Sequence, residues 1–244
     1  MFAACLHASA TLQRSFVHRH VDMMSSDIPS LANLDETCNF DERCIFFVTG
    51  NTKKELEVNT ILSAQEFGSF RVSHVDLDLP EYQGSPEYIA RHKCIEAANQ
   101  VESAVLVEDT SLCFDALNGL PGPYIKWFVD QLGNDGLYQL LNAHENKQAY
   151  CQCILAFSAG PGAEPIMWTG KCRGTIVSPR GSGGFGWDAI FIPEGKETPF
   201  GEMSLDEKNT ISHRARALEQ FVEYCRNNED AIFDAIDAAS ADLV

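Results

Sequence analysis

The stretch Cys44-Ile-Phe-Phe-Val-Thr-Gly-Asn-Thr-Lys-Lys54 indicates the fold class. Its first six residues form a continuous apolar run, which suits a strand buried on both faces. Gly-Asn then breaks the run. A helix is predicted to follow, since Thr52 and Glu55 have capping-box spacing and Leu56, Ile61 and Leu62 share one side. A buried strand that leads directly into a helix is typical of α/β proteins.

The same stretch offers a place for an anion. The first N–H groups of a helix carry a partial positive charge and bind phosphate, and Lys53 and Lys54 stand at this point. The spacing is not that of a Walker loop, which needs G-x-x-x-x-G-K-[ST]. Taken alone, the segment also fits an ordinary turn with solvated lysines.

The rest of the chain alternates between predicted strands and helices. Strands are expected at 70–77 and 104–108, an antiparallel pair at 149–158 and 166–178, and a further strand at 188–192. Helices are expected at 85–101, 124–131, 135–143 and 212–226, and a glycine-rich loop at 179–186. We therefore predict one α/β domain over residues 44–226.

Composition and charge exclude some classes of function. The 244 residues are 45% apolar and 22% charged, as in ordinary globular proteins. No apolar run is long enough to span a bilayer, so no membrane partner is expected. The net charge of −17 argues against a non-specific nucleic-acid binder, because phosphate backbones are held by excess Lys and Arg. A small anionic substrate bound with a metal ion stays compatible with this charge.

The cysteines and the chain ends bear on location. Nine scattered cysteines without zinc spacing indicate free thiols in a reducing compartment, and Cys151 and Cys153 are expected on the same core-facing side of a strand. The expected location is the cytoplasm. Residues 1–43 are predicted to be an N-terminal extension, in which residues 1–24 fit either a mitochondrial transit peptide or a disordered segment. Residues 227–244 form an acidic tail, either a short helix or frayed.

Two adjacent carboxylates, Glu108 and Asp109, follow an apolar strand. Ligands of α/β sheets gather at the carboxyl ends of strands, and Mg²⁺ prefers carboxylate oxygens together with substrate phosphates. If the strand continues, the two side chains point to opposite faces, so a shared pair is not assured. A capped turn is the alternative interpretation.

Two further segments could recognise a base or a phosphate. In Gly183-Gly-Phe-Gly-Trp-Asp188, glycines flank two aromatic rings on which a purine could stack, but the segment taken alone favours a tight turn anchored in the core by Phe185 and Trp187. In the segment 207–214, Lys208 and Ser212 are four residues apart and would share one face of a helix. His213 and Arg214 follow, and arginine offers a planar fork for phosphates or purine carbonyls. A surface pair is the alternative.

Together these segments resemble the inosine triphosphate pyrophosphatase family, the Ham1-like pyrophosphatases. The blocks TGNTKK, LPEYQG, LVEDTSLCFDALNGLPGPYIKWF, GFGWDAIF and EKNTISHRARAL occur in the family's order. The resemblance implies a long curved mixed β-sheet flanked by helices, with two lobes and an active-site cleft. It implies Mg-dependent hydrolysis of non-standard purine nucleoside triphosphates (ITP, dITP and XTP) to the monophosphate and pyrophosphate. It also implies a homodimer, with Mg²⁺ as the cofactor and Mn²⁺ as a substitute.

The resemblance further implies roles for individual residues. Asp109 would be the catalytic base and would hold the metal with Glu81, and Thr110 would contact the substrate. The remaining substrate-binding residues would be Thr49, Gly50, Asn51, Thr52, Lys53 and Lys54 in the phosphate turn; Lys93, Lys126 and Lys208 along the triphosphate; Phe185, Gly186, Trp187 and Asp188 in the base pocket; and His213 and Arg214 at the purine edge. Glu108 replaces an Asp that bacterial members often carry, which leaves its role open.

The residue types suit this chemistry, because phosphoryl transfer needs charge neutralisation and an oriented water more than covalent help. The main alternative from another class is a non-catalytic nucleotide sensor, which a missing metal carboxylate would favour. Both Glu81 and Asp109 are present. A Maf-like pyrophosphatase acting on pyrimidine or modified nucleotides is a second alternative, and the Ser-His-Arg and Phe-Gly-Trp-Asp segments argue against it.

Overall fold

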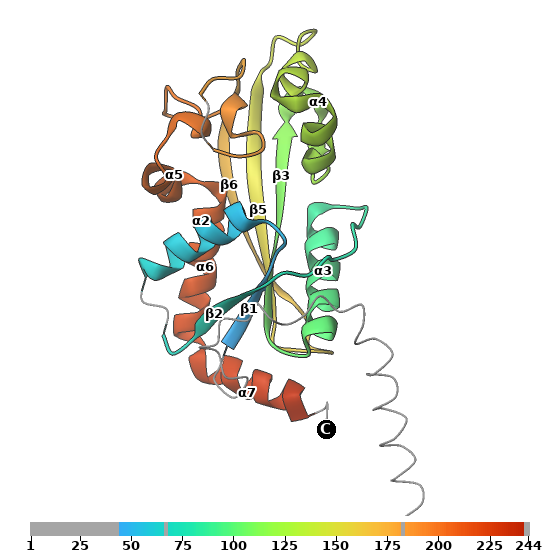
Figure 1. Cartoon of the computed structure of the whole chain (residues 1–244), viewed down its shortest axis with the longest axis vertical. Helices are drawn as coiled ribbons and strands as arrows, with labels where there is room; N and C mark the ends of the chain where they lie inside the picture. Colours follow the sequence, from blue (N-terminus) through green and yellow to red (C-terminus); the bar gives the residue numbers. More distant parts are fainter. Residues whose placement is uncertain (1–43, 66–67, 182–183, 242–244) are drawn as a thin grey trace, which may run out of the picture. The chain divides into compact units, whose positions relative to one another are not determined.

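The computed structural model describes residues 44–65, 68–181 and 184–241 (Figure 1). The predictions for residues 1–43 lie outside the described residues. No helix in the described ranges is long and apolar enough to cross a membrane.

A mixed sheet forms the centre of the domain. Its seven described strands are β1 (Cys44–Val48), β2 (Arg71–Val75), β3 (Val105–Phe114), β4 (Pro121–Gly122), β5 (Gln148–Ser158), β6 (Ile166–Ile176) and β7 (Phe191–Pro193). The order is β2-β1-β3-β5-β6-β7, and β4 pairs with β3. Strand β1 runs parallel to β2 and β3, whereas β3, β5, β6 and β7 pair antiparallel. The sequence predicted this α/β class and the antiparallel pair, and both are confirmed.

Helices cover both faces of the sheet. The described helices are α2 (Thr52–Ser63), α3 (Pro86–Val101), α4 (Ile125–Gln139), α5 (Leu205–Ile211), α6 (His213–Asn227) and α7 (Glu229–Ala241). Figure 1 shows α6 and α3 on opposite sides of the long strands, and both contact β5. Helix α2 packs beside α6, and α4 lies near the far end of β3.

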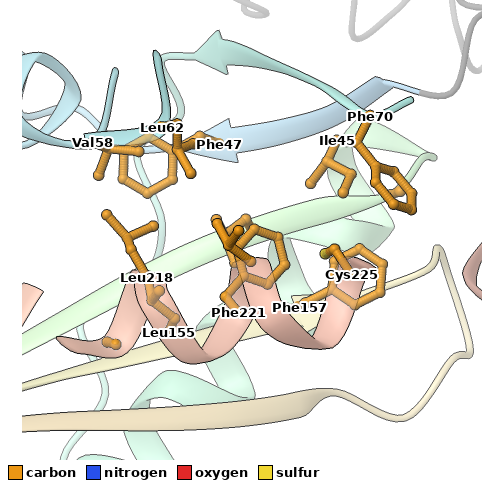
Figure 2. Packing of buried hydrophobic residues seen from close by; sticks show 14 of the residues in the cluster. Ile45, Phe47, Val58, Leu62, Phe70, Leu155, Phe157, Leu218, Phe221 and Cys225 are labelled. Carbon is orange, nitrogen blue, oxygen red and sulfur yellow. The ribbon is translucent and has the colours of Figure 1, made fainter. Parts of the chain in front are cut away.

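The core forms two clusters along the long strands. The first core cluster joins β1 to α2 and α6, and Figure 2 shows Ile45 and Phe47 facing Leu218 and Phe221. The second core cluster gathers side chains of α4, β7 and the far ends of β3, β5 and β6. These clusters form the cores of the two predicted lobes. Cys151 and Cys153 are fully buried, as expected, and they are free thiols, as are Cys94, Cys113, Cys172 and Cys225.

The start of α2 differs from its prediction. Asn51 caps the helix, because its side-chain oxygen accepts hydrogen bonds from the N–H groups of Lys53 and Lys54. The predicted capping box from Thr52 is therefore wrong by one residue. Leu56 is also not part of the buried side, since it is 58% exposed and Val58 takes its place in the core.

Later elements also differ in their bounds. The predicted helix 212–226 is α6, but Ser212 is its N-cap with ψ 158°, so Lys208 in α5 does not share a continuous helix face with it. The predicted strand 188–192 begins as a 3₁₀ turn, and only residues 191–193 pair with β6. Two short helices predicted at 124–131 and 135–143 are α4, which is interrupted at Gly133. The acidic tail forms helix α7 over its described part.

Candidate active site

All the residues proposed from the sequence line one cleft of about 760 Å³. The cleft is bounded by the β1–α2 turn, the loop before α3, strand β3, the start of α4, the turn before β7, and the α5–α6 junction. The predicted residues in its wall are Thr49, Gly50, Asn51, Thr52, Lys53, Lys54, Glu81, Lys93, Asp109, Thr110, Lys126, Phe185, Gly186, Trp187, Asp188, Lys208, His213 and Arg214. Segments more than 150 residues apart in the chain thus meet at one site.

The β1–α2 turn is held by polar contacts. The N–H of Asn51 donates to Thr49 Oγ1 at 3.2 Å. The ring of His74 on β2 lies against this turn, with Nε2 2.6 Å from the Thr49 carbonyl oxygen and Nδ1 3.5 Å from Glu55. A turn fixed in this way presents the N-terminus of α2 to the cleft, where the helix dipole favours an anion.

Strand β3 continues beyond the predicted residue 108, and its alternation separates the two carboxylates. Glu108 faces α2 and α6, where it accepts from Arg214 and lies 3.1 Å from Lys54 Nζ. Asp109 faces α3, where its Oδ1 lies 3.4 Å from Lys93 Nζ. Successive side chains of a strand point to opposite faces, so the two neighbours have different surroundings, as the sequence indicated.

The Asp109 side gathers carboxylates and lysines. Glu81 accepts from Lys93 at 2.9 Å and from Lys126 at 2.8 Å. Burial raises the pKa of Glu81, but hydrogen bonds from Lys126 and Lys93 outweigh it and leave that pKa below its usual value. Burial raises the pKa of Asp109 above its usual value, and Lys93 only partly opposes this.

The donor set around Asp109 fits a divalent cation. Lys93 Nζ lies within hydrogen-bond distance of both Glu81 and Asp109, so the two carboxylates are close to each other. Oδ2 of Asp109 is buried and has no hydrogen-bond partner in the described part of the chain. A buried carboxylate oxygen needs a compensating partner, and carboxylate oxygens are the ligands that Mg²⁺ prefers.

The Glu108 side is a buried ionic network. Arg214 is 1% exposed and donates from Nε and Nη2 to Glu108 and from Nη1 to Glu57. Lys208, also buried, donates to Glu57 at 2.8 Å and to Asp188 at 2.7 Å. Burial lowers the pKa of Arg214, but Glu108 and Glu57 outweigh it and hold that pKa well above its usual value. The charges therefore compensate one another inside the protein.

The Phe185–Asp188 turn closes the other end of the cleft. Asp188 Oδ2 accepts from the Phe185 N–H at 2.9 Å, which tightens the turn. Trp187 is buried and packs edge-on against Phe191 in the second core cluster. Phe185 stays partly exposed in the cleft wall, with Lys208 Nζ 4.9 Å from its ring centroid. The turn is thus both anchored in the core and open to a ligand.

His213 lies beside this turn as a buried imidazole. Its Nδ1 is 3.3 Å from Cys151 Sγ, and its Nε2 is buried without a partner among the described residues. Burial lowers the pKa of His213 well below its usual value, and the nearby charges of Arg214 and Lys208 lower it further. A neutral ring with one unpaired nitrogen is suited to a hydrogen bond with a ligand.

A comparison with models of protein families shows the family to which this chain belongs. The model of the Ham1 family matches residues 45–224, which is most of the chain and includes both ends of the cleft. The chain belongs to the Ham1 family.

Solved structures of Ham1 proteins share its fold. The Ham1 protein of Staphylococcus aureus is 24% identical, with a TM-score of 0.65 over 76% of this chain and 99% of that one. The HAM1 protein of Coxiella burnetii is 26% identical, with a TM-score of 0.66 over 75% and 98%. A nucleoside-triphosphatase, or dITP/XTP pyrophosphatase, from Mycobacterium abscessus is 28% identical, with a TM-score of 0.57 over 73% and 98%.

Two residues in this Ham1 site were missed by the sequence analysis. Glu57 binds both Lys208 and Arg214, and its only signal in the sequence is a carboxylate next to Val58, on the buried side of α2. His74 sits in a strand that the sequence predicts, but its contact with Thr49 depends on the pairing of β1 with β2. Neither contact follows from local spacing.

The state of His213 in this Ham1 protein can be measured directly. We expect its ring to remain neutral between about pH 6 and 8, where a free imidazole titrates, because burial and the charges of Arg214 and Lys208 disfavour the imidazolium. Long-range ¹H–¹⁵N correlation spectra should show ring nitrogen shifts that do not move over this range. The His213→Asn variant assigns the signals. A titrating signal that disappears in this variant would contradict the expectation.

Proposed function

We propose that this Ham1 protein hydrolyses non-standard purine nucleoside triphosphates (ITP, dITP and XTP) to the nucleoside monophosphate and pyrophosphate. The observation that carries the proposal is the division of one cleft into two chemically different ends. Lysines and the carboxylates Glu81 and Asp109 stand at one end, and an aromatic turn with a neutral imidazole stands at the other. The dITP/XTP pyrophosphatase from M. abscessus is similar in fold and supports this substrate class.

Asp109 is proposed as the catalytic base. In the reaction, a water oxygen attacks a phosphorus, the bridge between the α- and β-phosphates breaks, and the proton of the water passes to a carboxylate. Asp109 suits this step because its buried Oδ2 has no hydrogen-bond partner among the described residues and can accept a proton. Thr110, next to it, donates to Glu108 at 2.7 Å and lines the same wall.

Glu81 and Asp109 are proposed to hold Mg²⁺, with Mn²⁺ as a substitute, which would neutralise charge on the phosphate oxygens. Lys93 and Lys126 already contact Glu81, so they stand where a polyphosphate would meet the carboxylates. Lys53 and Lys54 add positive charge at the start of α2. Such preplaced charges stabilise the charge that develops during phosphoryl transfer.

Arg214 and His213 are proposed to select the base. Three of the five N–H donors of Arg214 are used by Glu108 and Glu57, which leaves two for a ligand. Inosine and xanthosine present a 6-oxo acceptor, whereas adenosine presents a 6-amino donor that would face these donors unpaired. A site built from buried donors rejects such a mismatch strongly.

The decisive test is pyrophosphate release from ITP, dITP and XTP, measured against ATP and GTP with Mg²⁺, with Mn²⁺ and with a chelator. We expect release from the first three with a divalent cation, and much slower release from ATP. Pyrimidine triphosphates as the preferred substrates would favour a Maf-like activity. Binding of ITP without any release would favour a nucleotide sensor.

The assembly and the cellular location are also proposed. Large apolar side chains on and beside α4 are exposed, including Leu120, Trp127 and Leu132, which supports a homodimer. Light scattering coupled to gel filtration tests this by giving the mass in solution. The free buried thiols support a reducing compartment such as the cytoplasm.

A further inference from the structure

Asn134 of helix α4 contacts the Phe185–Asp188 turn, which lines the end of the cleft proposed to bind the base. The helix is interrupted at Gly133, which has φ 62° and ψ −177°, a conformation that favours glycine. Asn134 follows the interruption, and its Nδ2 donates to the carbonyl oxygen of Gly186 at 3.0 Å. The residue itself does not line the cleft, whereas Gly186 does.

This hydrogen bond fixes the orientation of one peptide group. The Gly186–Trp187 peptide is planar and trans, so its carbonyl and its N–H point in opposite directions. With the carbonyl held by Asn134, the N–H of Trp187 is aimed away from α4. No group in residues 44–65, 68–181 or 184–241 accepts a hydrogen bond from this N–H. A backbone donor of fixed direction is therefore left for a ligand.

The turn is also closed by the Asp188 N–H, which donates to the Phe185 carbonyl oxygen at 3.1 Å across the Gly186–Trp187 peptide, but this bond leaves the Gly186 carbonyl without a partner of its own. Asp188 Oδ2 fixes the N–H of Phe185, and Lys53 Nζ lies 3.4 Å from the carbonyl oxygen of Gly184. Gly186 has φ 59°, and a Cβ placed on it would meet no atom within 4 Å. Glycine tolerates more than one backbone conformation, so the hydrogen bond from Asn134 limits the directions that the Gly186 carbonyl can take.

We propose that Asn134 is a positioning residue for recognition of a 6-oxopurine: it aims the N–H of Trp187 at the 6-oxo oxygen. The inference rests on the proposed function and deepens it. Asn134 acts through the backbone and touches neither the phosphates nor the catalytic carboxylate. It should therefore affect binding of the base and leave the phosphate end unchanged.

The test compares Asn134→Ala and the isosteric Asn134→Asp with wild type. Both variants lose the donor, and the aspartate also places a negative charge against the Gly186 carbonyl. We expect KM for ITP to rise about tenfold in Asn134→Ala, the effect of one hydrogen bond, and further in Asn134→Asp. The kcat should change less than about twofold, because the catalytic groups are untouched.

Two inhibitors separate the ends of the cleft. The inhibition constant of IMP, which carries the base, should rise with KM, whereas that of inorganic tripolyphosphate should stay at the wild-type value. Gln131→Ala, an exposed position on the same helix, is the matched control and should behave as wild type. Thermal unfolding of each variant checks that the domain remains folded.

An unchanged KM for ITP in both Asn134 variants would overturn the inference. An equal rise for IMP and tripolyphosphate would also overturn it, because that pattern indicates general loosening of the cleft. Failure of the proposed function looks different, since wild-type protein would then release no pyrophosphate from ITP, dITP or XTP.

Discussion

Replacing Asp109 by Asn should leave a folded protein with less than about one hundredth of the wild-type rate of ITP hydrolysis, since general-base catalysis alone contributes about 10²–10⁴-fold. Asn keeps the shape of the side chain but cannot take a proton from water and ligates a cation poorly. Burial disfavours the ionised form of Asp109 in the folded protein, so the neutral amide should not lower the free energy of unfolding.

Steady-state pyrophosphate release measures the rate, and urea unfolding measures the stability. Asp234→Asn makes the same chemical change at an exposed position of α7 and should retain full activity. Wild-type turnover by folded Asp109→Asn would remove Asp109 from the catalytic role. A low rate together with a large loss of stability would point to a structural role instead.

Replacing Arg214 by Ala should lower the free energy of unfolding by about 3–5 kcal/mol, the usual cost of breaking a buried ion pair. The change leaves Glu57 and Glu108 buried without their main cation. Arg173→Ala is the matched control. Arg173 pairs with Asp115 at the surface, with its side chain 54% exposed, so its loss should cost less than about 1 kcal/mol.

The same variant should be less selective for the base. We expect kcat/KM for ITP to fall far more than that for ATP, while the ratio of ITP to GTP changes much less because GTP shares the 6-oxo group. The three substrates are compared at a temperature at which urea unfolding shows the variant to be folded. A uniform fall for all three would place the influence of Arg214 at the phosphates, and an unchanged stability would contradict the buried network.

The sequence predicts most of the elements because their signals are local. The strand predicted from the apolar run at residues 44–49 and the helix predicted at 85–101 depend on neighbouring residues alone, and both elements form as expected. The alternation along β3 is also local. It correctly predicts that Glu108 and Asp109 face opposite sides once the strand continues.

The residue at which a helix begins is harder to predict, because several residue types can serve either as the N-cap or inside the helix. Serine is tolerated inside a helix and favoured as an N-cap. At Ser212 the second role applies, and the predicted helix face shared by Lys208 and Ser212 is lost. Asn51 and Thr52 are both competent caps, and the side chain that reaches the free N–H groups is that of Asn51.

The contacts of Glu57 and Asn134 could not be predicted from spacing. Glu57 lies 151 residues before Lys208, and Asn134 lies 52 residues before Gly186. Each partner is set by the packing of whole elements: α2 against α5 and α6, and α4 against the turn before β7. The local sequence shows only that Glu57 is a carboxylate on the buried side of a helix and that Asn134 follows a glycine, and neither fact identifies a partner.

Strands β3, β5 and β6 contribute side chains to both core clusters without a break. The two lobes are therefore joined by hydrogen-bonded sheet and not by a flexible linker. A movement of the two lobes apart as whole bodies would require these three strands to bend along their length. We therefore expect that substitutions in the sheet between the clusters, such as those that change its packing, alter turnover of a nucleotide without touching a ligand.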